Sequence, residues 1–126
     1  MKIVNFNINK VQNSINTVIE ETDIIGCILC SEEGLLIIDT FGYDSIYNPE
    51  IIAAMAASMI NDHNYGIIPP DEIVLHYSHQ NEKVIIRKVQ CKRKLQEFLL
   101  ITIVPLKMRY YRRYVNKLIK IVIKNL

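Results

Sequence analysis

The sequence predicts an α+β domain with the element order α-β-β-α-β-β-β-α, in which helices pack on a five-stranded antiparallel sheet. Two observations predict this class. Apolar residues recur every three or four positions near both ends and in the middle of the chain, which indicates helices. Between these stretches lie short apolar or alternating runs bounded by turn residues, which indicate strands. At 126 residues, the chain is expected to be one domain over residues 1–126.

The order of the elements follows from local signals. Asn7 or Asn9 can cap the first helix, and Gly34 lies where a short hairpin loop needs a positive φ angle. Runs that are apolar on both faces indicate strands at the centre of the sheet. The expected helices cover residues 9–21, 49–60 and about 106 onward, and the expected strands cover residues 23–31, 35–40, 72–78, 83–89 and 95–104.

The middle helix has an unusually wide apolar surface. Asn48, Pro49 and Glu50 mark its start as cap, first-turn proline and first-turn acid. Its apolar residues form a stripe of Ile52, Ala56, Met59 and His63, with Ala53 and Ile60 on one side of it and Ile51 and Met55 on the other. Such a helix is expected to contact its own sheet and also a second helix over the small residues. An ordinary core helix made of good helix formers explains the same pattern.

No catalytic, metal or cofactor site is predicted. Cys27 and Cys30 lie three apart within an apolar strand, so their side chains face opposite ways and packing is the favoured role. The spacing of His76 and His79 suits neither strand face, and His63 belongs to the apolar stripe. The glycines are too scattered for a phosphate-binding loop, and no nucleophile elbow is present.

Charge is divided unevenly along the chain. Residues 1–104 carry a net charge of −5, and residues 105–126 carry +7. The last helix is expected to present a basic stripe opposite its apolar face, formed by Arg109, Arg113, Lys117, Lys120 and Lys124. This stripe is either a solvated face or a surface for an acidic protein or anionic lipid. Nucleic-acid binding is a weaker hypothesis, because one basic helix lacks stacking aromatic residues on strands.

The remaining composition points to the cytoplasm. The first residues lack the apolar core of a signal peptide, and the run from Phe98 to Leu106 is too short to cross a membrane. Three cysteines do not form a secreted disulfide framework. Abundant Ile, Lys and Asn suggest an AT-rich archaeal or bacterial genome.

Residues 25–37 combine an apolar strand that has a glycine near its start with an acidic turn that ends in glycine and a second apolar strand. This run resembles the first hairpin of the roadblock domain family, of the dynein light-chain type. Residues 50–58 are similar to its alanine-rich central helix, and the leading helix separates the chain from the sister longin fold. The chain departs from the family at residues 79–82, where a commoner turn contains glycine.

The resemblance implies a sheet with the central helix on one face and the terminal helices on the other. It also implies a dimer, with the chain itself or a paralogue, in which central helices lie side by side and edge strands join. The expected interface is Ala53, Ala56, Ala57, Ile60, Ile73, Val74, Leu75, His76 and Tyr77. Family members scaffold or regulate small Ras-like GTPases without catalytic residues of their own. The surface for such a partner is expected at Ala54, Ser58, Asn61, Asp62 and Tyr65.

No arginine lies on this helix to serve as an inserted finger, so any stimulation of GTP hydrolysis would be indirect. Two other hypotheses stay open at this point. One is a longin-like adaptor or membrane tether that uses the basic last helix, and the other is a nucleic-acid-binding module.

Overall fold

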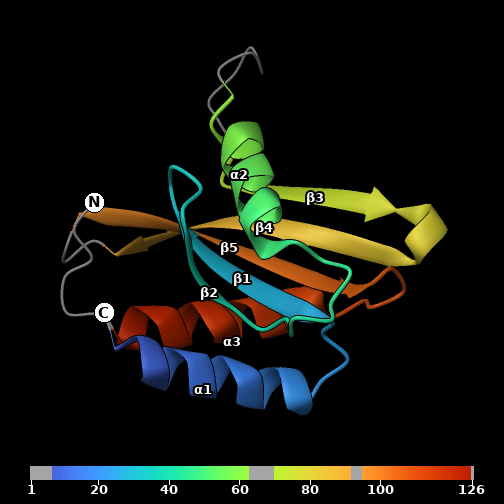
Figure 1. The fold of residues 1–126 in the computed structure, drawn as a ribbon, viewed down its shortest axis with the longest axis horizontal. Helices are drawn as coiled ribbons and strands as arrows, with labels where there is room; N and C mark the ends of the chain where they lie inside the picture. Colours follow the sequence, from blue (N-terminus) through green and yellow to red (C-terminus); the bar gives the residue numbers. More distant parts are fainter. Residues whose placement is uncertain (1–6, 63–69, 92–94, 126) are drawn as a thin grey trace.

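The computed structural model describes residues 7–62, 70–91 and 95–125, and these form one five-stranded antiparallel sheet with helices on both faces (Figure 1). The strand order across the sheet is β2-β1-β5-β4-β3. The predicted fold class is confirmed. The elements are α1 (Ile8–Glu20), β1 (Gly26–Ser31), β2 (Leu36–Asp39), α2 (Pro49–Ile60), β3 (Glu72–Tyr77), the short 3₁₀ helix η1 (Ser78–Gln80), β4 (Glu82–Cys91), β5 (Gln96–Pro105) and α3 (Tyr111–Lys124).

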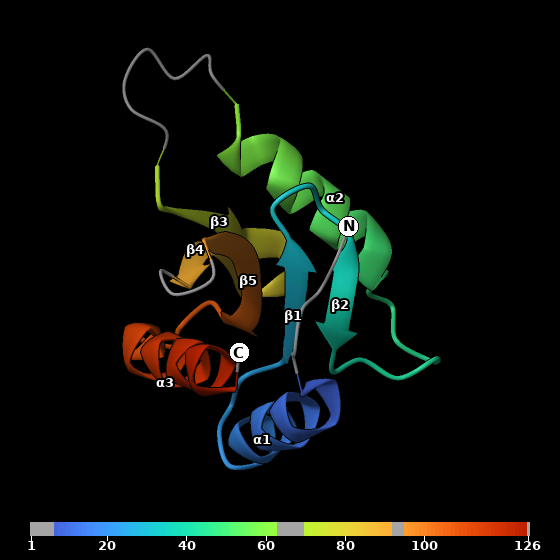
Figure 2. The same ribbon diagram turned by 90° about the vertical axis from the view of Figure 1, so that its left-hand side faces the viewer.

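The sheet separates two apolar clusters. α1 and α3 cover one face, and α2 crosses the other (Figure 2). The central strands β1 and β5 are buried on both faces, as their unbroken apolar runs predict. α2 packs chiefly on β1, β2 and β5, which leaves β3 at the far edge of the sheet.

Local signals in the sequence place the caps and turns. The Asn7 side chain accepts from Lys10 N at 3.2 Å, and the Asn48 side chain accepts from Ile51 N at 3.2 Å. Gly34 has a φ of 91°, as the first hairpin requires. In the turn before β4, Asn81 adopts the left-handed conformation with a φ of 55°, so asparagine replaces the glycine that such a turn commonly uses.

The last helix starts later than predicted. It begins at Tyr111 and not near Leu106, because the chain first makes a turn in which Met108 N donates to Pro105 O at 3.0 Å. The buried Lys83 fixes this turn, since its Nζ donates to Met108 O at 2.7 Å and lies 4.5 Å from the centre of the Tyr111 ring. The prediction that Met108 and Arg109 lie on the helix is therefore wrong.

In the described part of the chain, none of the helices is both long and apolar enough to span a bilayer.

Candidate protein-interaction surface

The outer edge of β3 presents unpaired backbone groups. Among the described residues, β3 pairs with β4 alone. Lys88 N donates to Asp71 O at 2.9 Å, and this contact continues the register that aligns Glu72 with Arg87. In an antiparallel pair, directly opposite residues alternate between bonded and non-bonded pairs. The backbone groups of Asp71, Ile73, Leu75 and Tyr77 therefore face β4, and those of Glu72, Val74 and His76 face outward.

The side chains of β3 alternate between the two faces of the sheet. Ile73 and Leu75 lie on the α2 side, where they pack half-buried at the margin of the apolar cluster. Val74 packs on the α3 side, next to Glu72. The Glu72 carboxylate lies 3.4 Å from Arg112 Nη1 and 3.8 Å from Arg87 Nη1, and its side chain is 17% exposed. The strand edge thus has an apolar face and a charged face.

Small residues bring one side of α2 close to the β1–β2 turn. A Cβ built on Gly34 would lie 3.0 Å from Ala57 Cβ and 3.1 Å from Ala53 O. The C-terminal end of the helix is fixed at the same place, because Asn61 Nδ2 donates to Glu32 O at 2.9 Å. The backbones of the helix and the hairpin are therefore in close contact here, which requires glycine or alanine at the contact positions.

This close approach decides which face of α2 is buried. Ala53, Ala56, Ala57 and Ile60 are all covered by the chain's own sheet, so the first expected stripe, with Ile52 and Met59 at its centre, is displaced by about 90° around the helix. We therefore revise the helix residues expected at a dimer interface. The four buried side chains are unavailable to a partner helix, whereas the β3 residues of the expected interface lie at the open edge.

The apolar surface that α2 leaves uncovered consists of four larger side chains. Ile52 and Met59 are half-buried and, like Ile73 and Leu75 on β3, pack at the margin of the apolar cluster on this face of the sheet. Met55 is half-buried as well. Ile51 is 65% exposed. We define the α2–β3 strip as Ile51, Ile52, Met55, Met59, Ile73, Leu75 and Tyr77. Its four helix residues are not among the residues expected at the interface, although Ile51 and Met55 already stand out in the sequence as apolar positions outside the central stripe.

The expected partner-binding residues lie on the rest of the helix. Ala54, Ser58, Asn61 and Asp62 are exposed, with Ala54 and Asn61 toward the β1–β2 turn. Tyr65, like His63, lies outside the described residues. None of these residues belongs to the α2–β3 strip.

The basic surface of α3 lies on the opposite face of the sheet (Figure 2). Arg113, Lys117, Lys120 and Lys124 are exposed and follow one line along the helix, away from the buried Val115, Leu118 and Val122. Arg109 is exposed too, in the turn before the helix. Arg112 is engaged with Glu72 and is not part of this line.

The cysteines of β1 and the histidines near the end of β3 are considered as sites of chemistry on sequence grounds. Cys27 and Cys30 are buried in β1, and burial raises the pKa of each thiol to about 12, so both are protonated at neutral pH. His76 and His79 are exposed at the end of β3 and in η1. Within the described ranges, histidine, cysteine and carboxylate side chains do not gather in threes as a metal site requires.

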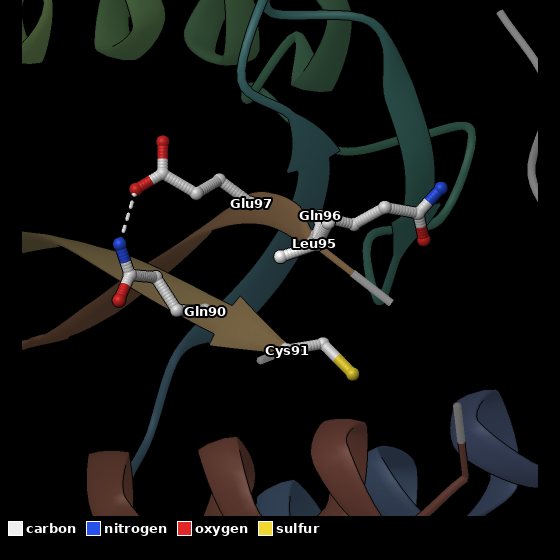
Figure 3. Close-up of a pocket in the computed structure, with 5 residues that line it drawn as sticks. All are labelled: Gln90, Cys91, Leu95, Gln96 and Glu97. Carbon is white, nitrogen blue, oxygen red and sulfur yellow. Dashed lines mark hydrogen bonds between the residues drawn. The ribbon is translucent and has the colours of Figure 1, made fainter. Parts of the chain in front are cut away.

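A cavity of about 260 Å³ lies where β4 ends and β5 begins (Figure 3). Gln90 Nε2 donates to Glu97 Oε1 at 2.7 Å on one side, and the buried Cys91 and the exposed Leu95 complete the lining with Gln96. Glu97 is the one carboxylate among these lining residues and it is hydrogen-bonded to Gln90, so the lining does not supply the pair of groups that general acid–base catalysis uses.

Comparison with known proteins supports the fold. No family model matches the sequence, and no curated protein matches it. Among solved structures, MglB of Myxococcus xanthus matches with a TM-score of 0.76 and 11% identity, over 98% of this chain and 92% of that one. A structure described as MglB with tetrameric arrangement matches at 0.64 and 12% identity, over 100% and 96%. The Roadblock/LC7 domain of Streptomyces avermitilis matches at 0.63 and 11% identity, over 90% and 91%. The chain therefore has the roadblock fold.

Proposed function

We propose that this chain is a non-enzymatic roadblock protein that forms a homodimer through the α2–β3 strip and binds a small Ras-like GTPase. The observation that carries the proposal is an open strand edge together with partly buried apolar side chains of α2 and β3 on the same face of the sheet. An exposed edge strand next to apolar side chains favours pairing with another chain. A second copy of this chain supplies the same edge and the same surface.

The alternation of backbone groups decides how two copies would face each other. Only even-numbered residues of β3 direct their backbone groups outward, so even residues pair with even residues across an antiparallel seam. Residues that pair directly have their side chains on the same face of the sheet. Both α2 helices therefore lie on one face of the joined ten-stranded sheet, and Ile51 and Met55 of each copy are directed into the space between them.

The GTPase partner is supported by the roadblock fold and by the outer surface of α2. In the dimer, Ala54, Ser58, Asn61 and Asp62 of both copies remain uncovered on the same face, where they form a broad and mostly uncharged platform. α2 carries no arginine that could enter a nucleotide site. The proposed protein therefore acts by binding and reshaping the GTPase, without a catalytic group of its own.

The dimer is tested first, by light scattering coupled to size exclusion at micromolar concentration. We expect twice the chain mass for the wild type and a folded monomer for Met55→Glu, because a carboxylate cannot enter a dry helix contact. Lys117→Glu, on the other face, is the matched control and is expected to stay dimeric. A well-folded wild-type monomer would contradict the proposal.

The partner is tested by biolayer interferometry with Ras-like GTPases from the same genome, loaded with GDP or a non-hydrolysable GTP analogue. We expect binding in at least one nucleotide state, and loss of that binding in Ser58→Arg with the dimer intact. Absence of binding by every such GTPase in both states would remove the GTPase from the proposal while leaving the dimer.

The exposed basic line on α3 favours a second role, attraction to anionic lipid. Each basic residue near an anionic bilayer contributes about 1 kcal/mol, and a dimer would present two such lines on one face. We expect co-flotation with liposomes that contain phosphatidylserine, none with neutral liposomes, and loss of flotation in Arg113→Glu with Lys117→Glu. Equal recovery with both kinds of liposome would contradict an electrostatic role.

A further inference from the structure

The free edge of β3 has a defined length, because a structural feature limits it at each end. Toward the N-terminus, Pro70 occupies the next outward position and has no N–H to donate. Toward the C-terminus, the chain leaves the strand at Ser78, whose carbonyl accepts from Asn81 N at 3.3 Å. The outward groups of the regular strand are therefore the N–H and C=O of Glu72, Val74 and His76.

These groups allow few registers for a twofold antiparallel seam. When the axis passes through Val74, Glu72 pairs with the partner's His76 and Val74 with the partner's Val74, so all of the outward groups within the strand are bonded. An axis through Ile73 pairs Glu72 with the partner's Val74 and leaves His76 opposite a proline. An axis through Leu75 pairs Val74 with the partner's His76 and leaves Glu72 opposite η1. Each of these two shifted registers therefore makes fewer hydrogen bonds across the seam than the register centred on Val74.

The side chains favour the same register. Centred on Val74, the seam sets Ile73 against the partner's Leu75 on the α2 face, which joins the two α2–β3 strips without a polar residue between them. Centred on Ile73, it would set Asp71 against the partner's Leu75. Centred on Leu75, it would set Glu72 opposite η1 of the partner and not opposite an imidazole.

We propose that two copies of this chain join at β3 in the register centred on Val74, so that each Glu72 lies opposite the partner's His76 across the seam. This inference rests on the proposed homodimer and specifies its interface. The Glu72 carboxylate lies 3.4 Å from Arg112 Nη1 and 3.8 Å from Arg87 Nη1, and an imidazole N–H is a donor that a carboxylate can also accept from. Lys83, which is aligned with His76 on β4, directs its ammonium group away, to Met108 O. The pair occurs twice in the dimer and selects the register.

Single cysteine variants distinguish the three registers, since each register brings one residue next to its own copy. Opposite Cα atoms in an antiparallel pair lie about 4.5–5.5 Å apart, within disulfide range, whereas positions displaced by two residues lie about 7–8 Å apart. Val74→Cys, Ile73→Cys and Leu75→Cys are each oxidised mildly and run on non-reducing gels. The native cysteines are buried, so the wild type serves as the background control.

We expect Val74→Cys to form a covalent dimer at least tenfold faster than Ile73→Cys or Leu75→Cys. An equimolar mixture of Ile73→Cys and Leu75→Cys is expected to cross-link, which also shows that both variants fold. Faster self-linking of Ile73→Cys or Leu75→Cys would overturn the register but leave the dimer. A wild-type dimer in which none of these variants cross-links would place the interface elsewhere and overturn the inference, whereas a wild-type monomer would overturn the proposed function itself.

The Glu72–His76 contact is tested by His76→Glu, which would set two carboxylates opposite each other twice in the seam. We expect the dimer dissociation constant to rise several-fold, because like charges directly opposite destabilise a strand pair. His79→Glu adds the same charge in η1, outside the seam, and is expected to leave the constant unchanged. Equal effects of the two substitutions would show that net charge, and not the register, governs association.

Discussion

A charge placed on the two sides of α2 should have opposite consequences. Ala57 is 5% exposed and lies against the β1–β2 turn, whereas Ala54 is exposed. Ala57→Glu must bury a carboxyl group within the apolar cluster to which Ala57 belongs, so the group is expected to stay protonated in the folded protein. Keeping a glutamate protonated at pH 7 costs about 3–4 kcal/mol, from the distance between pH 7 and its ordinary pKa.

The added volume makes this cost larger. Gly34 packs so closely against Ala57 that a larger side chain at position 57 has no room, and overpacking a tight core costs about 1–3 kcal/mol. The sum of about 4–7 kcal/mol is comparable with the whole stability of a typical domain, about 5–15 kcal/mol. Ala54→Glu faces water and should change stability by less than about 0.5 kcal/mol.

Urea denaturation followed by circular dichroism at pH 7 and at pH 4.5 measures both effects. The electrostatic part of the Ala57→Glu cost should shrink as the pH falls, because a carboxyl whose pKa is raised by folding destabilises only above its unfolded pKa. Ala57→Met, which adds volume without charge, should show no such recovery. A folded Ala57→Glu monomer with wild-type stability would refute the buried orientation of this face and return Ala57 to the dimer interface.

The other predictions concern turns and one hydrogen bond. Gly34→Ala should lower the free energy of unfolding by about 1–3 kcal/mol, because φ is 91° and α2 must shift, whereas Gly42→Ala, which meets no atom within 4 Å, should change it by less than about 1 kcal/mol; equal effects in urea denaturation would contradict this. The Tyr47 hydroxyl donates to the Glu82 carboxylate. Burial, and to a smaller extent the Glu82 carboxylate, raise the pKa of Tyr47 from 10.0 to about 12. The contribution of this hydroxyl to stability is therefore complete below pH 10 and is lost as the pH rises to 12. Tyr47→Phe should lose about 1 kcal/mol at pH 8 and fall less steeply than the wild type in melts between pH 10 and 12; parallel curves would contradict it. Leu95→Asn should raise the melting temperature slightly, because Leu95 is 94% exposed with a φ of 50°, and an unchanged or lower value would contradict it.

The fold could be predicted because its signals are local. The cap at Asn48 and the turn at Gly34 each depend on a few neighbouring residues, and the structure confirms both. The start of α3 could not be predicted in this way. It depends on Lys83, which is distant in sequence and binds Met108 O and the Tyr111 ring. A periodicity that includes Met108 and Arg109 gives no sign of that contact.

The orientation of α2 was beyond the sequence for a different reason. Apolar residues cover more than half of its circumference, so periodicity alone does not choose a buried face. The buried face is set by how closely the β1–β2 turn approaches α2 at Gly34, because only the side of the helix that carries alanines can pack against that turn. A cluster of alanines beside larger apolar residues is therefore a usable signal. The small residues indicate close contact within the chain, and Ile51 and Met55 indicate the surface left for another.

The edge position of β3 is likewise a property of the whole sheet, since strand order is set by pairings between distant segments. Once β3 is known to be the edge strand, the alternation of its backbone groups shows which residues could pair with another chain. In the proposed dimer, the even-numbered outward groups would place both α2 helices on one face of the joined sheet and the two α3 surfaces on the other. GTPase binding and lipid attraction would then use opposite faces of one sheet. Substitutions such as Ser58→Arg and Lys117→Glu should therefore affect one activity each, and a variant of one face that abolished both would contradict this arrangement.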